Sequence, residues 1–217
     1  MRDDLKRNSV KIILSLIILV IASIAFIFLK PESMASRFKL EYESLNGQKT
    51  DDGREYMEVN INNDNKIVYA DYKTIFDVLD GTGVIYFGFP ECPWCRNAVP
   101  ILLEAAEESG IKQIYYLNNH DDRDTKVLKD GEVITENEGT SNYNKLLEKL
   151  GDKAIKRLYY PTVVFVKNGE ITDYIEGTVE SQEDPYTPLT KNQRQELKDK
   201  YKSAINNLLS CDQDSKC

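Results

Sequence analysis

The sequence lacks the surplus of positive charge that a nucleic-acid-binding protein needs. Its 217 residues contain 28 lysines and arginines against 36 aspartates and glutamates, which gives a formal net charge of −8. Because contacts with phosphates require a basic surface, nucleic acid is excluded as the main partner. The acidic balance otherwise indicates only that the water-exposed part of the chain stays soluble.

Histidine and cysteine are also scarce. The only histidine, His120, lies in the polar stretch NNHDDRD and is expected on the surface, since nothing in the sequence brings it near a cysteine. The four cysteines form two close pairs, Cys92 with Cys95 and Cys211 with Cys217. An even number of cysteines in close pairs fits a compartment where disulfides form and persist.

Long apolar runs are absent except at the N-terminus, where the 18 residues 12–29 (IILSLIILVIASIAFIFL) carry no charge. A helix of this length spans about 27 Å, close to the ~30 Å hydrocarbon core of a bilayer. A buried core helix is less favoured, because the run is apolar on all faces. A cleaved signal peptide, with residues 33–36 as a weak cleavage site, stays open, although its apolar region would be about 7–15 residues long. No cysteine follows closely, which excludes a lipid-modified cysteine as the anchor.

The charges that flank this run predict its orientation. Arg2, Lys6, Arg7 and Lys11 precede it, so the positive-inside rule places the N-terminus in the cytoplasm and everything after the run outside. The polar residues that follow are expected to form a tether, in which 36–47 could be a short helix or a strand. The predicted division is a cytoplasmic N-terminus (1–11), a transmembrane helix (12–29), the tether (30–54), an α/β domain (55–210) and a C-terminal tail with a cysteine pair (211–217).

From Glu55 onward, strand and helix patterns alternate. Runs of β-branched and aromatic residues predict strands, and apolar residues at helical spacing predict helices. The expected strands are 56–61, 83–89, 111–117 and two strands within 160–177 joined at Asn168-Gly169, and the expected helices are 70–83, 95–109 and 188–210. The segment 118–152 is extra, with a hairpin about Asp130-Gly131 and a helix ending at Gly151. This order predicts an α/β domain with a mixed central sheet.

Cys92 and Cys95 lie where a predicted strand meets a predicted helix. Free backbone N–H groups and the helix dipole stabilise an anion at such a position, so the pKa of Cys92 should fall below its ordinary range. Cys95, one turn further on, is placed to attack a mixed disulfide formed on Cys92. Pro93 suits the first helical position, where no N–H is needed. The pattern therefore favours a reactive dithiol.

Two other interpretations of the pair are weaker. A zinc site would need further ligands from Cys211, Cys217 or His120, and the spacing between the tail cysteines is unusual for a second half-site. A structural staple across two intervening residues would close a very short loop, and the stabilisation by a disulfide grows with loop length. No metal is therefore expected.

The sequence after the pair resembles the active-site helix of the thioredoxin superfamily, in which a proline follows the second cysteine by five residues, as Pro100 does here. The stretch 160–177 resembles the C-terminal half of that family, where a cis-proline and a threonine open a strand that leads to a hairpin and a glycine. Pro161, Asn168-Gly169 and Gly177 match in order and spacing. The resemblance covers about residues 55–210 and implies a thioredoxin fold, a central mixed sheet flanked by helices, with an insertion at about 118–152.

The resemblance also implies roles for individual residues. Cys92 would be the attacking cysteine and Cys95 the resolving cysteine. Pro161 would be cis and pack beside them, leaving the backbone of Tyr160 to bind an extended substrate strand. Trp94, between the cysteines, could contact substrate at the rim of the site or pack on the insertion.

Four positions depart from the thioredoxin pattern. Tyr86 occupies the place of the family's buried, proton-accepting aspartate, and Glu91 replaces the tryptophan before the first cysteine. Glu91 is expected to be solvated, and its charge should limit the fall in the pKa of Cys92. The residues between the cysteines, Pro93 and Trp94, match none of the family's common pairs, so the sequence leaves open whether the site oxidises, reduces or isomerises disulfides.

The whole chain resembles membrane-anchored bacterial thioredoxin-like proteins, including accessory proteins of bacteriocin transport. This implies an extracytoplasmic thiol-disulfide oxidoreductase, anchored in the cell membrane by residues 12–29, that acts on exported proteins or peptides, with a membrane protein as a candidate redox partner. No cofactor is expected beyond the Cys92–Cys95 disulfide. The alternative is a non-enzymatic accessory module that binds a peptide or exporter component beside Pro161. Cys211 and Cys217 could form a small disulfide in the tail or a second redox pair.

Overall fold

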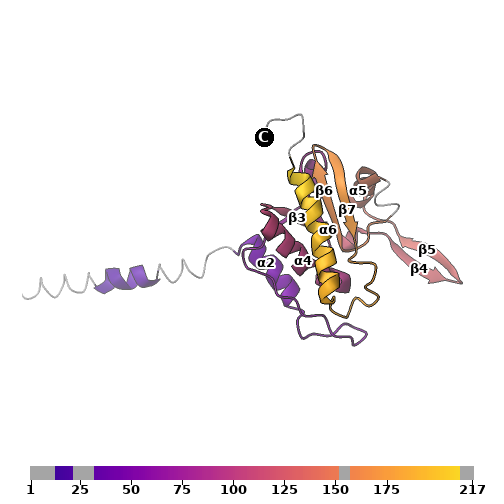
Figure 1. Ribbon diagram of the computed structural model, residues 1–217. Coiled ribbons are helices and arrows are strands. Elements are labelled where there is room, and N and C mark those ends of the chain that lie inside the picture. The colour runs from indigo at the N-terminus through magenta and orange to yellow at the C-terminus, as the bar shows by residue number, and fades with distance from the viewer. Residues whose placement is uncertain (1–12, 22–31, 152–156, 211–217) are drawn as a thin grey trace, which may run out of the picture. The chain divides into compact units, whose positions relative to one another are not determined.

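The computed structural model describes residues 13–21, 32–151 and 157–210 (Figure 1). The chain divides into two units, Met1–Ser33 and Met34–Cys217. In the first unit, residues 13–21 are helical. No helix within the described ranges combines the length and the apolar character needed to cross a membrane. Half of the predicted span, residues 12 and 22–29, lies outside the described residues, and so do Cys211 and Cys217.

The second unit is built on a five-stranded mixed sheet. Its strands are β1 (Ile67–Tyr69), β2 (Gly83–Phe87), β3 (Ile114–Leu117), β6 (Thr162–Lys167) and β7 (Glu170–Glu176). They lie in the order β1-β3-β2-β6-β7, with β3 parallel to both β1 and β2. Strand β6 is antiparallel to β2 and to β7. The mixed sheet predicted from the sequence is therefore confirmed.

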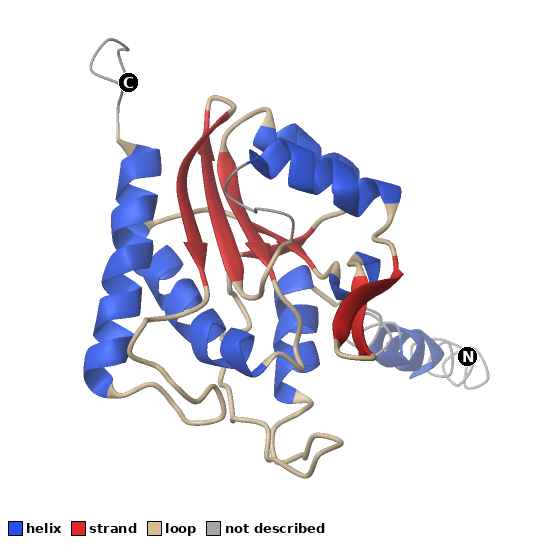
Figure 2. Cartoon of the chain, turned by 90° about the vertical axis from the view of Figure 1, so that its right-hand side faces the viewer, coloured by secondary structure: helices blue, strands red, loops and turns tan. Residues whose placement is uncertain are grey.

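Helices cover both faces of this sheet. The helices are α2 (Met34–Glu43), α3 (Tyr72–Leu79), α4 (Pro93–Ser109), α5 (Ser141–Leu150) and α6 (Lys191–Leu209). Helix α4 packs against α6, which contacts β6 and β7, whereas α3 packs against α5 and contacts β2 (Figure 2). Thr190 and Gln193 form a capping box at the start of α6. The central strand β2 is buried almost throughout, because both of its faces are covered.

The segment predicted as a tether contributes to the folded domain. Helix α2 lies within 30–54, and its Phe38 and Tyr42 are completely buried in the core. The ring of Phe38 packs edge-on against that of Tyr116 in β3, with the centroids 4.9 Å apart. The helical alternative for 36–47 is therefore confirmed, and the tether prediction is wrong for α2. Burying the two aromatic side chains stabilises the packing of α2 on the domain by roughly 1.5–3 kcal/mol for each side chain.

The segment 56–61, which the sequence predicts as the first strand, is not a strand in the structure. Its apolar side chains are buried as a strand's would be, with Val59 and Ile61 at 5% and 2% exposure. Its backbone, however, bonds to side chains: Asn46 both donates to the carbonyl of Val59 and accepts from its N–H. The first strand of the sheet is instead β1, which the sequence analysis did not predict.

The insertion at 118–152 has the predicted form. Strands β4 (Thr125–Lys129) and β5 (Glu132–Asn137) make a separate two-stranded sheet around Asp130-Gly131. Both residues have positive φ, as the turn requires. A short 3₁₀ helix (His120–Asp122) precedes the hairpin, and α5 follows it with Thr140 as its N-cap. In Figure 1 the hairpin projects away from the main sheet.

Candidate functional site

The two central cysteines meet at the start of α4, directly after β2 and a short loop. Cys92 is the N-cap residue, and its sulfur accepts a hydrogen bond from the backbone N–H of Cys95 at 3.2 Å. Pro93 occupies the first helical position, so the missing N–H costs nothing. Both cysteines are free thiols, Cys92 at 5% exposure and Cys95 at 0%. The site is thus a dithiol with one slightly exposed and one enclosed sulfur.

The surroundings of Cys92 favour its thiolate. Burial acts to raise the pKa of Cys92, but hydrogen bonds from the Cys95 side chain and from the backbone N–H groups of Cys95 and Trp94 outweigh it. The positive charge of Arg123, in the insertion, acts in the same direction. The net result is a pKa of Cys92 below its ordinary range. This is the direction that a helix N-terminus predicts.

Cys95 has the opposite character. Burial raises the pKa of its thiol well above the ordinary range, and the hydrogen bond and negative charge of Cys92 raise it further. Hydrogen bonds from the Phe89 backbone and from the Tyr86 side chain partly oppose this rise. In the reduced pair Cys92 is therefore the thiol that ionises first as the pH rises, while Cys95 keeps its proton to higher pH. Disulfide exchange requires one thiol that ionises readily and attacks first, and a second thiol that reacts after it.

The lowered pKa predicts how the site reacts with an alkylating agent. Only the thiolate attacks iodoacetamide, so alkylation of Cys92 should reach half of its maximal rate at a lower pH than for an unperturbed thiol. Replacing Arg123 with glutamine should move that midpoint upward, because a cation that favours the thiolate is lost. The measurement is alkylation rate against pH by mass spectrometry, with Cys211 and Cys217 replaced by serine. A midpoint at or above the value for free cysteine would contradict the assignment.

A cis-proline lies beside the dithiol. The Tyr160–Pro161 peptide bond is cis, as the resemblance implied. The Cys92 thiol lies 3.7 Å from the carbonyl oxygen of Tyr160, toward which its S–H points as a donor. The Tyr160 hydroxyl donates to Asn119 at 2.9 Å, and the Thr162 hydroxyl donates to the carbonyl of Tyr159 at 2.7 Å. The Cys92 contact joins the loop before β6 to the start of α4, 68 residues away in the chain, and the Tyr160 hydroxyl ties the same loop to the segment that follows β3.

An open groove runs from this loop past the residue between the cysteines. It has a volume of ≈ 500 Å³ and is lined by Trp94, Tyr159, Tyr160, Glu176, Gly177, Thr178, Val179, Glu180, Gln182 and Lys200. Trp94 is partly buried against the core, whereas Tyr159 is 55% exposed. No residue of the insertion lines the groove. Trp94 therefore lies at the rim beside the cis-proline loop, where the side chains that follow β7 form the opposite wall.

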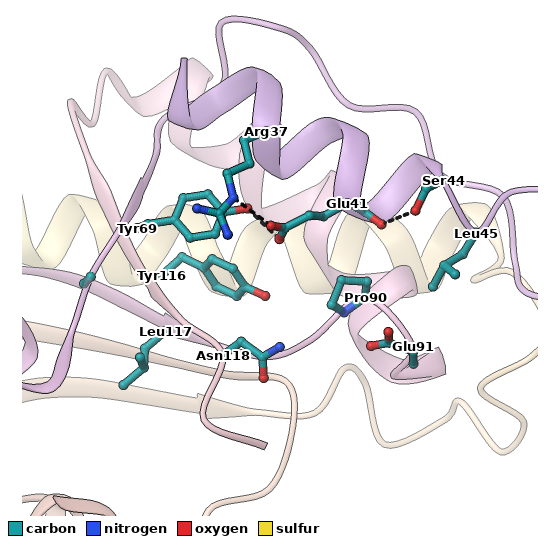
Figure 3. Close-up of a pocket in the computed structure, with 11 residues that line it drawn as sticks. Arg37, Glu41, Ser44, Leu45, Tyr69, Pro90, Glu91, Tyr116, Leu117 and Asn118 are labelled. Atoms are coloured by element: carbon teal, nitrogen blue, oxygen red, sulfur yellow. Dashed lines mark hydrogen bonds and ion pairs between the residues drawn. The ribbon is translucent and has the colours of Figure 1, made fainter. Parts of the chain in front are cut away.

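A second cavity, of ≈ 490 Å³, borders the loop that leads to Cys92 (Figure 3). Helix α2 contributes Arg37 and Glu41, which form an ion pair at 2.9 Å. Pro90 and Glu91 come from the loop, and Tyr116 from β3. Glu91 is exposed, as expected for a solvated charge.

Besides Arg123, three residues contribute to the surroundings of the site without a signal in the sequence. His120 is exposed, as expected, but its ring lies 4.2 Å from that of Phe89 and 6.3 Å from that of Tyr160, measured between centroids. The carboxyl ends of the parallel strands β2 and β3 share one edge of the sheet, and this topology could have placed the residues that follow them together. Arg96 and Tyr42 are both completely buried behind the cysteines. No local pattern marks them, because their partners are distant in the sequence.

Metal ligation has no candidate in the part of the chain that the structure describes. Within these residues no group of three histidine, cysteine, aspartate or glutamate side chains is arranged to hold a metal ion. The tail cysteines considered as zinc ligands, Cys211 and Cys217, lie outside the described residues, so the zinc interpretation is tested only for Cys92, Cys95 and His120.

Comparison with known proteins finds similarity to solved structures alone. No family model matches the chain, and no curated protein matches it. Oxidised thioredoxin O1 from Arabidopsis thaliana is 16% identical, with a TM-score of 0.35 over 53% of this chain and 88% of that one. The thioredoxin of Malassezia sympodialis is 19% identical, with a TM-score of 0.35 over 65% and 87%. The thioredoxin of Aeropyrum pernix is 19% identical, with a TM-score of 0.32 over 56% and 77%. Values this low carry no information on substrate or activity, which have to be inferred from the chain's own residues.

Proposed function

We propose that the protein is a thiol-disulfide oxidoreductase in which Cys92 is the nucleophile and Cys95 the resolving cysteine. The observation that carries the proposal is the contrast between the two thiols. The pKa of Cys92 is lowered while that of Cys95 is raised, and the Cys92 sulfur faces the carbonyl of Tyr160, a residue that lines the open groove. Cys92 is thus the thiol that ionises first and the one that is slightly exposed.

The proposed reaction consists of two successive thiol-disulfide exchange steps. In the reducing direction the Cys92 thiolate attacks a partner's disulfide, forms a mixed disulfide and releases one partner sulfur as a thiolate. Cys95 then loses its proton to solvent and attacks the Cys92 sulfur. The Cys92–Cys95 disulfide forms, and the partner leaves as a dithiol that has gained two electrons. The oxidising direction is the reverse sequence.

The groove supplies a place for the partner. We infer that an extended peptide bearing the reacting cysteine lies along Tyr160 and Pro161, with Trp94 and the residues after β7 as its walls. The exposed ring of Tyr159 would add apolar contact. In this proposal Trp94, Tyr160 and Pro161 are the residues that bind the substrate.

The setting of the reaction is a further part of the proposal. The uncharged run 12–29 and the positive charges before it support a single membrane anchor, with the redox domain on the extracytoplasmic side. Exported proteins or peptides with cysteines would then be the substrates, a membrane thiol protein the redox partner, and Cys92 and Cys95 the only redox group required. The similarity to accessory proteins of bacteriocin transport belongs to this proposal. Fractionation of cells, with protease added from outside, tests the location.

An exchange assay tests the activity in both directions. The purified full-length chain should accelerate the reduction of insulin disulfides by dithiothreitol, or the oxidation of a reduced test protein. Absence of activity in both assays, with Cys92 and Cys95 intact as judged by thiol titration, would reject the oxidoreductase. A chain that binds peptide under those conditions would instead be a non-enzymatic binding module.

The reduction potential of the pair decides the direction. A value near about −270 mV would indicate a reductant, and a value near about −120 mV an oxidant. Equilibration with glutathione buffers, followed by trapping of free thiols, measures it.

A further inference from the structure

Behind the dithiol lie two tyrosine hydroxyls. The buried guanidinium of Arg96 donates to the backbone carbonyl of one of these residues, Tyr42, at 2.8 Å. The hydroxyls of Tyr42, from α2, and Tyr86, from β2, are 2.8 Å apart, and either could be the donor. Both residues are completely buried, as is Cys95. Burying a hydroxyl group lowers the stability of the fold unless the group forms hydrogen bonds inside the protein.

The Tyr86 hydroxyl lies close to the sulfur of the resolving cysteine, Cys95. A β-carbon added to Gly88 would overlap the Tyr86 hydroxyl and lie 3.0 Å from the Cys95 sulfur, so both atoms pack against the same glycine. A hydrogen bond between Tyr86 and Cys95 acts to lower the pKa of Cys95, against the larger effect of burial. The Tyr86 hydroxyl is thus hydrogen-bonded to that of Tyr42 and packs against the same glycine as the Cys95 sulfur.

The surroundings leave the tyrosines no other role than that of neutral donors. Burial raises the pKa values of Tyr42 and Tyr86 well above the ordinary range, so neither can accept the Cys95 proton as a base. Among the described residues, those that are buried include no aspartate or glutamate. The titratable groups that face Cys95 are Cys92 from α4, Tyr86 from β2, Tyr42 from α2, Tyr116 from β3, Tyr201 from α6 and Tyr160 before β6.

We propose that Tyr86 donates a hydrogen bond to the Cys95 thiolate as it forms, and that Tyr42 orients Tyr86 by donating to its oxygen, so that helix α2 is part of the redox site. This rests on the proposed exchange reaction. In the resolving step Cys95 gives its proton to solvent and its thiolate attacks the Cys92 sulfur. A thiolate enclosed in the core needs a donor, and Tyr86 is in position to be that donor. Tyr86 is then a catalytic residue and Tyr42 a positioning residue.

Two-phase reaction with Ellman's reagent separates the two cysteines. Attack of Cys92 on the reagent's disulfide releases one thionitrobenzoate, and attack of Cys95 on the resulting mixed disulfide releases the second. Every protein used also carries Cys211→Ser and Cys217→Ser, so that only the central pair reacts. The rate of each phase is followed by absorbance over a range of pH.

Tyr86→Phe is expected to slow the second phase by about tenfold, the effect of one hydrogen bond to a charged group. The second phase should also shift to higher pH, because the Cys95 thiolate is less stable, while the first phase keeps its rate. Tyr42→Phe should slow the second phase less. The double variant should be no slower than Tyr86→Phe alone, since Tyr42 acts through Tyr86. Additive slowing would indicate a merely structural role for Tyr42.

Tyr116→Phe is the matched control. Its hydroxyl is buried and has no hydrogen-bond partner among the described residues, and its ring stacks on that of Tyr86 at 5.4 Å between centroids. Both phases should keep their wild-type rates in this variant. An unchanged second phase in Tyr86→Phe, or equal slowing in Tyr116→Phe, would overturn the proposal.

Two further outcomes are distinguishable. If Tyr86→Phe does not fold, as judged by circular dichroism, Tyr42→Phe still tests the donor chain through the rate and pH profile of its second phase, and wild-type behaviour there overturns it. If the wild-type pair releases only one thionitrobenzoate, the exchange function itself fails, and the donor chain fails with it.

Discussion

Replacing Cys92 with serine is expected to reduce disulfide exchange to the rate of the uncatalysed reaction. The serine hydroxyl keeps the size and the hydrogen bonds of the N-cap position, so the fold should be retained. It does not ionise in the accessible pH range and cannot attack a disulfide. Cys95 cannot take over, because it is completely buried and the pKa of its thiol is raised well above the ordinary range. Insulin reduction and oxidation of a reduced test protein both measure the loss.

Cys95→Ala provides the contrasting variant. It keeps the Cys92 nucleophile and removes the resolving thiol, so mixed disulfides with partner proteins should accumulate and be visible on non-reducing gels. The pKa of Cys92 should also rise somewhat, since one of its stabilising hydrogen bonds comes from the Cys95 side chain. Full activity of Cys92→Ser, in a chain whose Cys211 and Cys217 are also serine, would show that the central pair is not the redox site.

The reactive corner could be predicted because its signals are local. The apolar run of β2, the two cysteines and Pro93 follow one another within a dozen residues, and each has a direct physical meaning for a strand, a thiolate and a helix start. The position of Pro161 beside Cys92 is not local. It followed from the resemblance of a second sequence block, and the 3.7 Å contact with the Tyr160 carbonyl agrees with it.

The segment 56–61 shows where the sequence pattern misleads. Alternating burial of Val59 and Ile61 is real, but strand formation depends on where the backbone hydrogen bonds go. Asn46 satisfies both backbone groups of Val59, and Glu43 accepts from the N–H of Ile61 at 2.7 Å. Side chains at the end of α2 and just after it thus replace a neighbouring strand. Nothing in the period-two pattern distinguishes these two sources of hydrogen bonds.

Helix α2 was missed as part of the domain for a related reason. Its apolar positions are few and fit a helix or a strand, and its partners Tyr86 and Tyr116 lie in distant strands. The same holds for Arg96, which by sequence would be an ordinary cation on an amphipathic helix. Its burial depends on acceptors that only the folded chain brings together.

Replacing Arg96 with methionine is expected to destabilise the domain by about 3 kcal/mol, because hydrogen bonds to a charged group contribute roughly 1.5–3 kcal/mol each and buried acceptors would be left without donors. The Arg96 guanidinium donates to four oxygens: the carbonyls of Met57 at 2.6 Å, Tyr42 at 2.8 Å and Pro90 at 3.2 Å, and the side chain of Asn46 at 2.7 Å. Arg96 itself is completely buried. Urea unfolding measures the change as a shift in midpoint at constant slope.

Arg194→Met is the matched control for this variant. Arg194 pairs with Glu104 at 3.0 Å, but both side chains are nearly half exposed, so its loss should cost about 1 kcal/mol or less. Arg96→Lys should fall close to Arg96→Met, since one ammonium cannot reach acceptors that a planar guanidinium reaches on several sides. A loss in Arg96→Met no larger than in Arg194→Met would contradict the structural role. Arg96 joins the end of α2 to Pro90, two residues before Cys92. The hydrogen bonds that stabilise the fold therefore also hold the loop before Cys92 in place. The alkylation rate of Cys92 should consequently change in Arg96→Met along with the stability.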